Sequence, residues 1–166
     1  KTDSNVKISL SNDIINVDTA LIAIGVKGNY ESILGDMDIK IDKSFIVTNK
    51  FMQTSYDNIY AIGDIAGPPW LAHVASSEGI LAVEHLSGLN PSPINYENIP
   101  GCTYCKPEIA SIGLTEEQAI NKGYKIKIGK FPLSASGKAM AVSSTEGFAK
   151  IIFDEKYGEL LGFHMI

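Results

Sequence analysis

Residues 54–64 read Thr-Ser-Tyr-Asp-Asn-Ile-Tyr-Ala-Ile-Gly-Asp, and this stretch decides the fold that we expect. Residues 58–62 are apolar and β-favouring, which predicts a short buried strand. Gly63 would end that strand and let the backbone come close to a ligand. Asp64 then places a carboxylate beyond the carboxyl end of the strand, where open parallel α/β sheets bind ligands. Because a carboxylate only accepts hydrogen bonds, it suits the hydroxyls of a ribose or ribitol chain.

Two later segments decide how this stretch is interpreted, because a lone Gly-Asp pair more often caps a turn. Residues 68–73 read Pro-Pro-Trp-Leu-Ala-His, and residues 107–117 read Pro-Glu-Ile-Ala-Ser-Ile-Gly-Leu-Thr-Glu-Glu. In this order, the three segments resemble the second flavin-binding motif, the flavin-contacting segment and the start of the dimerisation domain of the pyridine nucleotide–disulfide oxidoreductases. The resemblance covers nearly the whole chain, which matches only the C-terminal part of such an enzyme.

The resemblance implies an α/β fold in which a partial FAD/NAD(P)-binding, Rossmann-like segment precedes a partial α+β dimerisation domain. Residues 1–26 would end the NAD-binding domain, and residues 27–93 would form the C-terminal half of the FAD-binding domain. Residues 94–166 would form a truncated dimerisation domain. The linker at 89–93, Leu-Asn-Pro-Ser-Pro, suggests the boundary before it, because its two prolines interrupt any periodicity.

The same resemblance implies FAD and NAD as cofactors and indicates which residues would meet them. Asp64 would hold the ribitol or pyrophosphate end of FAD, and Gly25 would lie beside the nicotinamide nucleotide. The pyrimidine edge of the flavin would be lined, largely by backbone, by Trp70, Leu71, Ala72 and His73. The family usually continues Gly-Arg-x-Pro-Asn after this glycine, but the chain reads Gly-Val-Lys-Gly-Asn at 25–29, so any role of that arginine is absent.

The activity implied for the intact enzyme is oxidation of dihydrolipoamide to lipoamide, with electrons passing through a cysteine pair and FAD to NAD. These 166 residues contain no Cys-x-x-x-x-Cys pair and no Gly-x-Gly-x-x-Gly loop. The family's His-Pro segment is also missing, so we assign no catalytic residue and expect the chain alone to be inactive. The alternatives are a related reductase acting on glutathione, mercuric ion or a transhydrogenase substrate, or a non-catalytic dimerisation module at 96–166.

Composition limits the partners and the location. The net charge of −5 and the absence of arginine argue against nucleic acid. The sequence contains no uninterrupted run of about 18 apolar residues, so it predicts no membrane span. Two cysteines favour a reducing cytoplasm over a disulfide scaffold. The resemblance implies a homodimer through the C-terminal domain and, as partners, lipoyl domains of 2-oxo acid dehydrogenase complexes. The chain lacks a first methionine and ends in an apolar run, so we interpret it as a fragment.

The expected elements before the linker follow from hydrophobic spacing. Residues 6–10 and 14–17 alternate and predict a hairpin, whereas the apolar run at 19–25 predicts a buried strand of a parallel sheet. A helix is expected from 70 or 71 to about 86, ending at Gly88. Its amino end, near Asp64, would stabilise the negative charge of a reduced flavin.

After the linker the pattern is α+β. Strands are expected at 103–105, 109–112, 124–131, 148–153 and 159–166, with a capping box at Thr115 opening a helix that ends at Gly123. Cys102 and Cys105 would face opposite sides of one strand, so we interpret them as independent structural thiols and predict no metal site. His85 and His164 are assigned no catalytic role.

Overall fold

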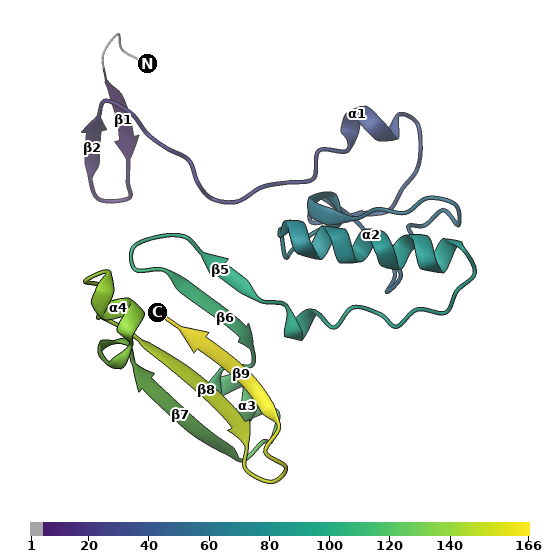
Figure 1. Ribbon diagram of the computed structural model, residues 1–166. Helices are drawn as coiled ribbons and strands as arrows, with labels where there is room; N and C mark the ends of the chain where they lie inside the picture. Colours follow the sequence, from purple (N-terminus) through teal and green to yellow (C-terminus); the bar gives the residue numbers. More distant parts are fainter. Residues whose placement is uncertain (1–4) are drawn as a thin grey trace. The chain divides into compact units, whose positions relative to one another are not determined.

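The computed structural model describes residues 5–166, which divide into two compact units (Figure 1). The first unit ends at Leu71, and the second runs from Ala72 to Ile166. The fold is mixed α/β, as the sequence predicts. The predicted boundaries after residues 26 and 93 differ from this division and stay a prediction.

The first unit begins with the predicted hairpin. Strands β1 (Val6–Ser9) and β2 (Ile14–Val17) pair antiparallel, with Val6 opposite Val17. The turn is closed by Asp13, whose carbonyl accepts from the Leu10 amide at 2.8 Å while its side chain accepts from the Ile14 amide. A turn-forming carboxylate between two short apolar runs therefore fixes the register of the hairpin.

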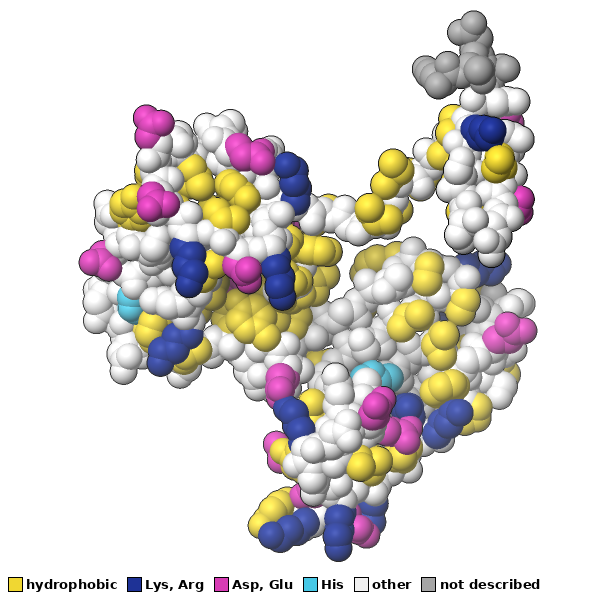
Figure 2. Space-filling model, turned by 180° about the vertical axis from the view of Figure 1, so that it is seen from behind, with side chains coloured by type: hydrophobic (Ala, Val, Ile, Leu, Met, Phe, Trp, Pro, Cys, Tyr) yellow, Lys and Arg dark blue, Asp and Glu magenta, His cyan; other side chains and the backbone are white. Residues whose placement is uncertain are grey.

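The prediction of a buried strand at 19–25 is wrong. These residues form no strand, and Leu21 and Ile24 are 89% and 93% exposed. Hydrophobic side chains are visible along the stretch that leaves the hairpin (Figure 2). No strand among residues 5–166 pairs with this run, and a backbone without a neighbouring strand takes its hydrogen bonds from water. The apolar composition alone was insufficient, because a strand also needs at least one neighbouring strand to pair with.

The rest of the first unit packs around a small core. Helix α1 (Glu31–Leu34) precedes strands β3 (Ile41–Asp42) and β4 (Phe45–Ile46), which form a hairpin. The buried core residues are Ile39, Ile46 and Ala61, and the side chains packed against them include Tyr30, Leu34, Ile59 and Ile65. Thus the stretch at 54–64 contributes Ala61 to this core.

The prediction of a strand at 58–62 is also wrong. Residues 57–58 are a turn, and the only ladder pairing within this part of the described chain is a single antiparallel bridge between Gln53 and Tyr60. The Ala61 amide donates to the carbonyl of Met52 at 3.0 Å, and Met52 is 4% exposed. The segment is extended and half-buried, but it lacks the continuous neighbour that a strand requires.

The second unit opens with the predicted helix, α2 (Ala72–Leu86). Its carboxyl end is a Schellman motif, in which the Leu89 amide donates to the Glu84 carbonyl and the Gly88 amide to the His85 carbonyl. Gly88 has φ = +79°, a conformation that favours glycine. The residues that follow, 89–95, are irregular before the short 3₁₀ turn η2 (Tyr96–Asn98).

A five-stranded antiparallel sheet forms the rest of the second unit (Figure 1). Its strand order is β5-β6-β9-β8-β7. The strands are β5 (Gly101–Thr103), β6 (Ile109–Gly113), β7 (Ile126–Pro132), β8 (Phe148–Asp154) and β9 (Leu160–Met165). The connection from β7 to β8 contains the turn η3 (Leu133–Ala135) and helix α4 (Gly137–Ala141). No helix of the described chain is long and apolar enough to cross a bilayer.

Helix α3 (Glu116–Asn121) packs against this sheet. The predicted capping box is confirmed, because the Thr115 side chain accepts from the Gln118 amide and the Gln118 side chain accepts from the Thr115 amide. Ala119 of α3 and Ile152 of β8 are fully buried and share a core with Leu161. This core fixes the helix against β8 and β9.

The β3–β4 hairpin generates a stability prediction. Its two-residue loop, Lys43-Ser44, has φ of +46° and +69°, the left-handed geometry for which glycine is preferred at the second position. We expect Ser44→Gly to raise the free energy of unfolding by about 1 kcal/mol in urea titrations, because it removes left-handed strain. As a control, Ser32→Gly inside the exposed helix α1 should lower it. A destabilised Ser44→Gly variant would contradict the strain argument.

Candidate functional site

Asp64 lies in the 3₁₀ turn η1 (Gly63–Ala66), directly after Gly63. Gly63 has φ = +70°, so the predicted need for glycine at this bend is met by its geometry. The Asp64 carboxylate is exposed, and among the described residues it makes no hydrogen bond or ion pair. The turn therefore presents an acceptor group at the surface, although it follows an extended segment and not the predicted strand.

Trp70 and Gly25 come together within the first unit. The Trp70 ring lies 5.9 Å from the Phe45 ring, centroid to centroid, in a tilted pair. A Cβ atom built on Gly25 would lie 4.0 Å from Cη2 of Trp70. The family resemblance assigned both residues to cofactors, and the structure places the Trp70 ring close to both Phe45 and Gly25.

Leu71, Ala72 and His73 lead into helix α2. The Leu71 amide donates to the Pro69 carbonyl, and the helix begins at Ala72. The exposed His73 ring donates from Nε2 to the Pro100 carbonyl at 3.1 Å. A carbonyl only accepts, so this contact places the proton on Nε2. The family resemblance implies backbone contacts of His73 to flavin, and this side-chain contact was not anticipated. The predicted proximity of the helix amino end to Asp64 spans the two units and stays a prediction.

Glu78, in the middle of α2, was missed by the sequence analysis. It is 5% exposed, and its Oε1 accepts from the Tyr96 hydroxyl at 2.7 Å. Burial, followed by the hydrogen bond and the charge of Glu78, raises the pKa of Tyr96 above its ordinary value. The available signal was spacing, since Glu78 falls on the same helix face as the buried Val74, Leu81 and Ala82.

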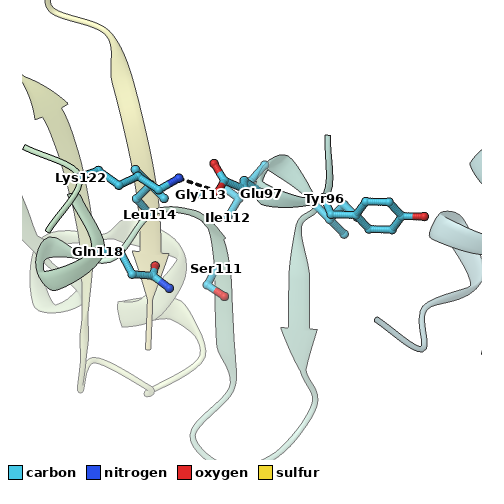
Figure 3. A pocket seen from close by; sticks show the side chains of 9 residues that line it. Tyr96, Glu97, Ser111, Ile112, Gly113, Leu114, Gln118 and Lys122 are labelled. Atoms are coloured by element: carbon cyan, nitrogen blue, oxygen red, sulfur yellow. Dashed lines mark hydrogen bonds and ion pairs between the residues drawn. The ribbon is translucent and has the colours of Figure 1, made fainter. Parts of the chain in front are cut away.

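A cavity of about 300 Å³ lies where turn η2, strand β6 and helix α3 meet (Figure 3). It is lined by polar and apolar groups, including Ser111, Leu114 and Gln118. Lys122, which caps the carboxyl end of α3, and Glu97 of η2 form an ion pair at its margin. Their side chains are 42% and 60% exposed, so water screens this pair.

Cys102 and Cys105 are both free and exposed, but the predicted strand that carries them is wrong. Strand β5 ends at Thr103, so Cys105 lies beyond it. The Cys105 thiol donates to the Pro107 carbonyl at 2.9 Å. The chain bends here because the Cys105 amide donates to the Thr103 carbonyl, two residues back. The argument from opposite strand faces therefore fails, and only the exposure of the two thiols supports their independence.

His164 has a structural contact in the sheet. Its Nε2 donates to the Leu114 carbonyl at 2.9 Å, joining β9 to the segment that follows β6. Among residues 5–166 no group of three or more His, Cys, Asp or Glu side chains is arranged to hold a metal ion.

Two family models match the chain. The model for the pyridine nucleotide-disulphide oxidoreductase matches residues 1–79. The model for the dimerisation domain of the same family matches residues 99–166. Between them they cover the stretch with Asp64, the 70–73 segment and the five-stranded sheet.

Curated relatives of high similarity are dihydrolipoyl dehydrogenases. The protein of Zymomonas mobilis is 50% identical over 149 residues, which are 89% of this chain and 32% of the relative. The protein of Bacillus subtilis is 44% identical over 171 aligned positions, covering 100% of this chain and 36% of the relative. The chain thus spans about a third of the length of the curated relatives that it matches.

Solved structures give the same fold. The HOCl-induced flavoprotein disulfide reductase RclA from Escherichia coli superposes with a TM-score of 0.87 at 26% identity. The match covers 98% of this chain and 38% of the RclA chain.

The two cysteines generate a chemical prediction. We expect both Cys102 and Cys105 to react with a thiol reagent, Cys102 faster, because only the Cys105 thiol donates a hydrogen bond to a carbonyl. Reagent titration followed by peptide mass mapping measures the two rates. The variants Cys102→Ser and Cys105→Ser are the controls, since each should leave the other rate unchanged. A Cys102–Cys105 disulfide, or stoichiometric zinc, would contradict independence.

Proposed function

Since the chain belongs to the pyridine nucleotide-disulphide oxidoreductase family, we propose that it forms part of a dihydrolipoyl dehydrogenase. The observation that carries the proposal is the identity of 44–50% to dihydrolipoyl dehydrogenases over 89–100% of this chain. The whole protein would oxidise dihydrolipoamide to lipoamide and reduce NAD. The groups that exchange electrons with the substrate would belong to other parts of that protein, because these 166 residues lack the family's cysteine pair.

The residues present fit FAD. Asp64 is exposed and unpaired among the described residues, so its oxygens can accept from the hydroxyls of the ribitol chain. The glycine before it, at φ = +70°, has no side chain to stand between backbone and ligand. Trp70 is held against Phe45, which limits the freedom that the indole would lose on binding. FAD, when bound, supplies the electron-carrying step between the dithiol and NAD.

Helix α2 adds an electrostatic contribution. Its first amides, beginning at Ala72, have no acceptor within the helix and carry a partial positive charge. The pyrimidine edge of a reduced flavin is negative, so a flavin seated on residues 70–73 would be stabilised by this helix end. Gly25, on which a Cβ atom would lie 4.0 Å from the Trp70 ring, would form the adjoining wall toward the nicotinamide nucleotide.

The matched dimerisation domain supports a homodimer through residues 94–166. By family resemblance the partners are lipoyl domains of 2-oxo acid dehydrogenase complexes, and the compartment is the cytoplasm. The net charge of −5 is compatible with both, and the chain has no arginine with which to recognise nucleic acid phosphates.

The assignment of Asp64 predicts a loss of FAD. In the full-length protein, Asp64→Ala should weaken FAD affinity about tenfold to hundredfold, because one charge-assisted hydrogen bond contributes about 1.5–3 kcal/mol. Flavin content after dialysis and a flavin fluorescence titration measure the effect. Asp57→Ala is the matched control, an exposed aspartate of the same stretch that should leave affinity unchanged. Equal flavin retention in both variants would remove Asp64 from the site.

The activity itself is tested by NAD reduction that depends on dihydrolipoamide, with FAD added. We expect turnover from the full-length protein and none from these 166 residues, because disulfide exchange needs a thiolate pair and proton transfer needs a base. Activity of the 166 residues alone would mean that the catalytic groups are misplaced. A full-length protein that binds FAD without this activity would favour a glutathione or mercuric reductase. A stable dimer that binds no FAD would favour a non-catalytic module.

A further inference from the structure

Turn η2 connects through adjacent residues to two helices of the second unit, α2 and α3. Tyr96 reaches Glu78 of α2, and Glu97 reaches Lys122, the residue that caps the carboxyl end of α3. Figure 3 shows the Tyr96 ring pointing away from the Glu97–Lys122 pair, with its hydroxyl farthest from that pair. The turn is stiffened locally, because the Asn95 side chain accepts from the Glu97 amide at 3.1 Å. Its two outward contacts are therefore made from a fixed backbone.

The two contacts differ in burial. Glu78 is 5% exposed, so an unsatisfied oxygen at this position would be costly, and the Tyr96 hydroxyl satisfies it. Glu97 and Lys122 both have substantially exposed side chains, and exposed ion pairs contribute little. The connection to α2 is therefore the stronger of the two.

A second contact joins the same helix to the same segment. His73, the second residue of α2, donates to the carbonyl of Pro100, the residue before β5. The first turn and the middle of α2 are thus attached at two points to residues 96–100. Two attachments about one and a half turns apart fix both the position and the rotation of a helix, because residues 73 and 78 lie on different turns.

We infer that Tyr96 and Glu78 are positioning residues, which, together with the His73–Pro100 contact, hold the first turn of α2 in the orientation that binds flavin. This rests on the proposed function, because His73 and Ala72 belong to the segment assigned to the flavin. As positioning residues, Tyr96 and Glu78 would not contact the cofactor themselves. They act by fixing the amides at the start of α2, so losing them should weaken FAD binding without altering the chemistry.

The experiment compares three substitutions in the full-length protein. Tyr96→Phe removes only the hydroxyl from a side chain that is 41% exposed, so the variant should fold. Glu78→Gln keeps an acceptor for that hydroxyl and should retain part of the function. Glu97→Gln is the matched control, because it alters the neighbouring residue of the same turn and affects only the exposed pair.

We expect Tyr96→Phe to raise the dissociation constant for FAD about tenfold. Glu78→Gln should raise it less, and Glu97→Gln should not change it. At saturating FAD, kcat and the KM for dihydrolipoamide of Tyr96→Phe should return to wild-type values. In hydrogen exchange without FAD, amides 76–80, which donate to carbonyls in the first turns of α2, should exchange faster in Tyr96→Phe, whereas the amide of Ile152 in the sheet core should not.

The outcomes distinguish a failure of the positioning role of Tyr96 and Glu78 from a failure of the proposed FAD binding. A wild-type protein that does not bind FAD overturns both. A wild-type protein that binds FAD, with Tyr96→Phe equal to Glu97→Gln in affinity, overturns the inference alone. Faster exchange throughout the sheet of Tyr96→Phe would also overturn it, because the tyrosine would then serve general stability and not the position of α2.

Discussion

The second unit depends on the close approach of two backbones beside strand β9. A Cβ atom at Gly162 would lie 2.1 Å from the carbonyl oxygen of Leu114, so no other residue fits there without displacement. The approach allows the Leu114 amide to donate to the Leu161 carbonyl at 2.8 Å. It also brings Leu161 of β9 and Ile152 of β8 into the core that Ala119 completes. The position of α3, and through Lys122 one contact of turn η2, follows from this backbone pairing.

The sequence predicts those elements whose determinants are local. The capping box at Thr115, the glycine at 88 and the turn at Asp13 each act within a few residues, and the structure has all three. The failures at 19–25 and 58–62 have one cause. Both runs have strand composition, but a strand is defined by neighbours that supply its hydrogen bonds, and the described chain supplies almost none to either.

In the candidate site, too, the features determined by adjacent residues could be predicted, and the contacts between distant segments could not. Gly63 and Asp64 could be predicted because a bend that favours glycine is followed directly by a carboxylate that can accept hydrogen bonds. Trp70 came from the family pattern, but its ring contact with Phe45 and its proximity to Gly25 could not be predicted, because they involve segments far apart in sequence. The pairing of helix α2 with turn η2 is of the same kind. A buried glutamate on an apolar helix face indicates a partner without indicating which residue it is.

Backbone strain and a small core together indicate how the proposed FAD binding would affect the first unit. Lys43, Ser44 and Met52 all have positive φ, and such residues cost about 1–2 kcal/mol each. The core that offsets this strain contains three buried residues, Ile39, Ile46 and Ala61. A ligand that binds only the folded form stabilises it by mass action. Contacts made to residues 63–70 would therefore be made to loops whose order the small core supports only weakly. Binding of the proposed cofactor would then be coupled to the ordering of these loops, so a change that disorders the loops would also weaken cofactor binding.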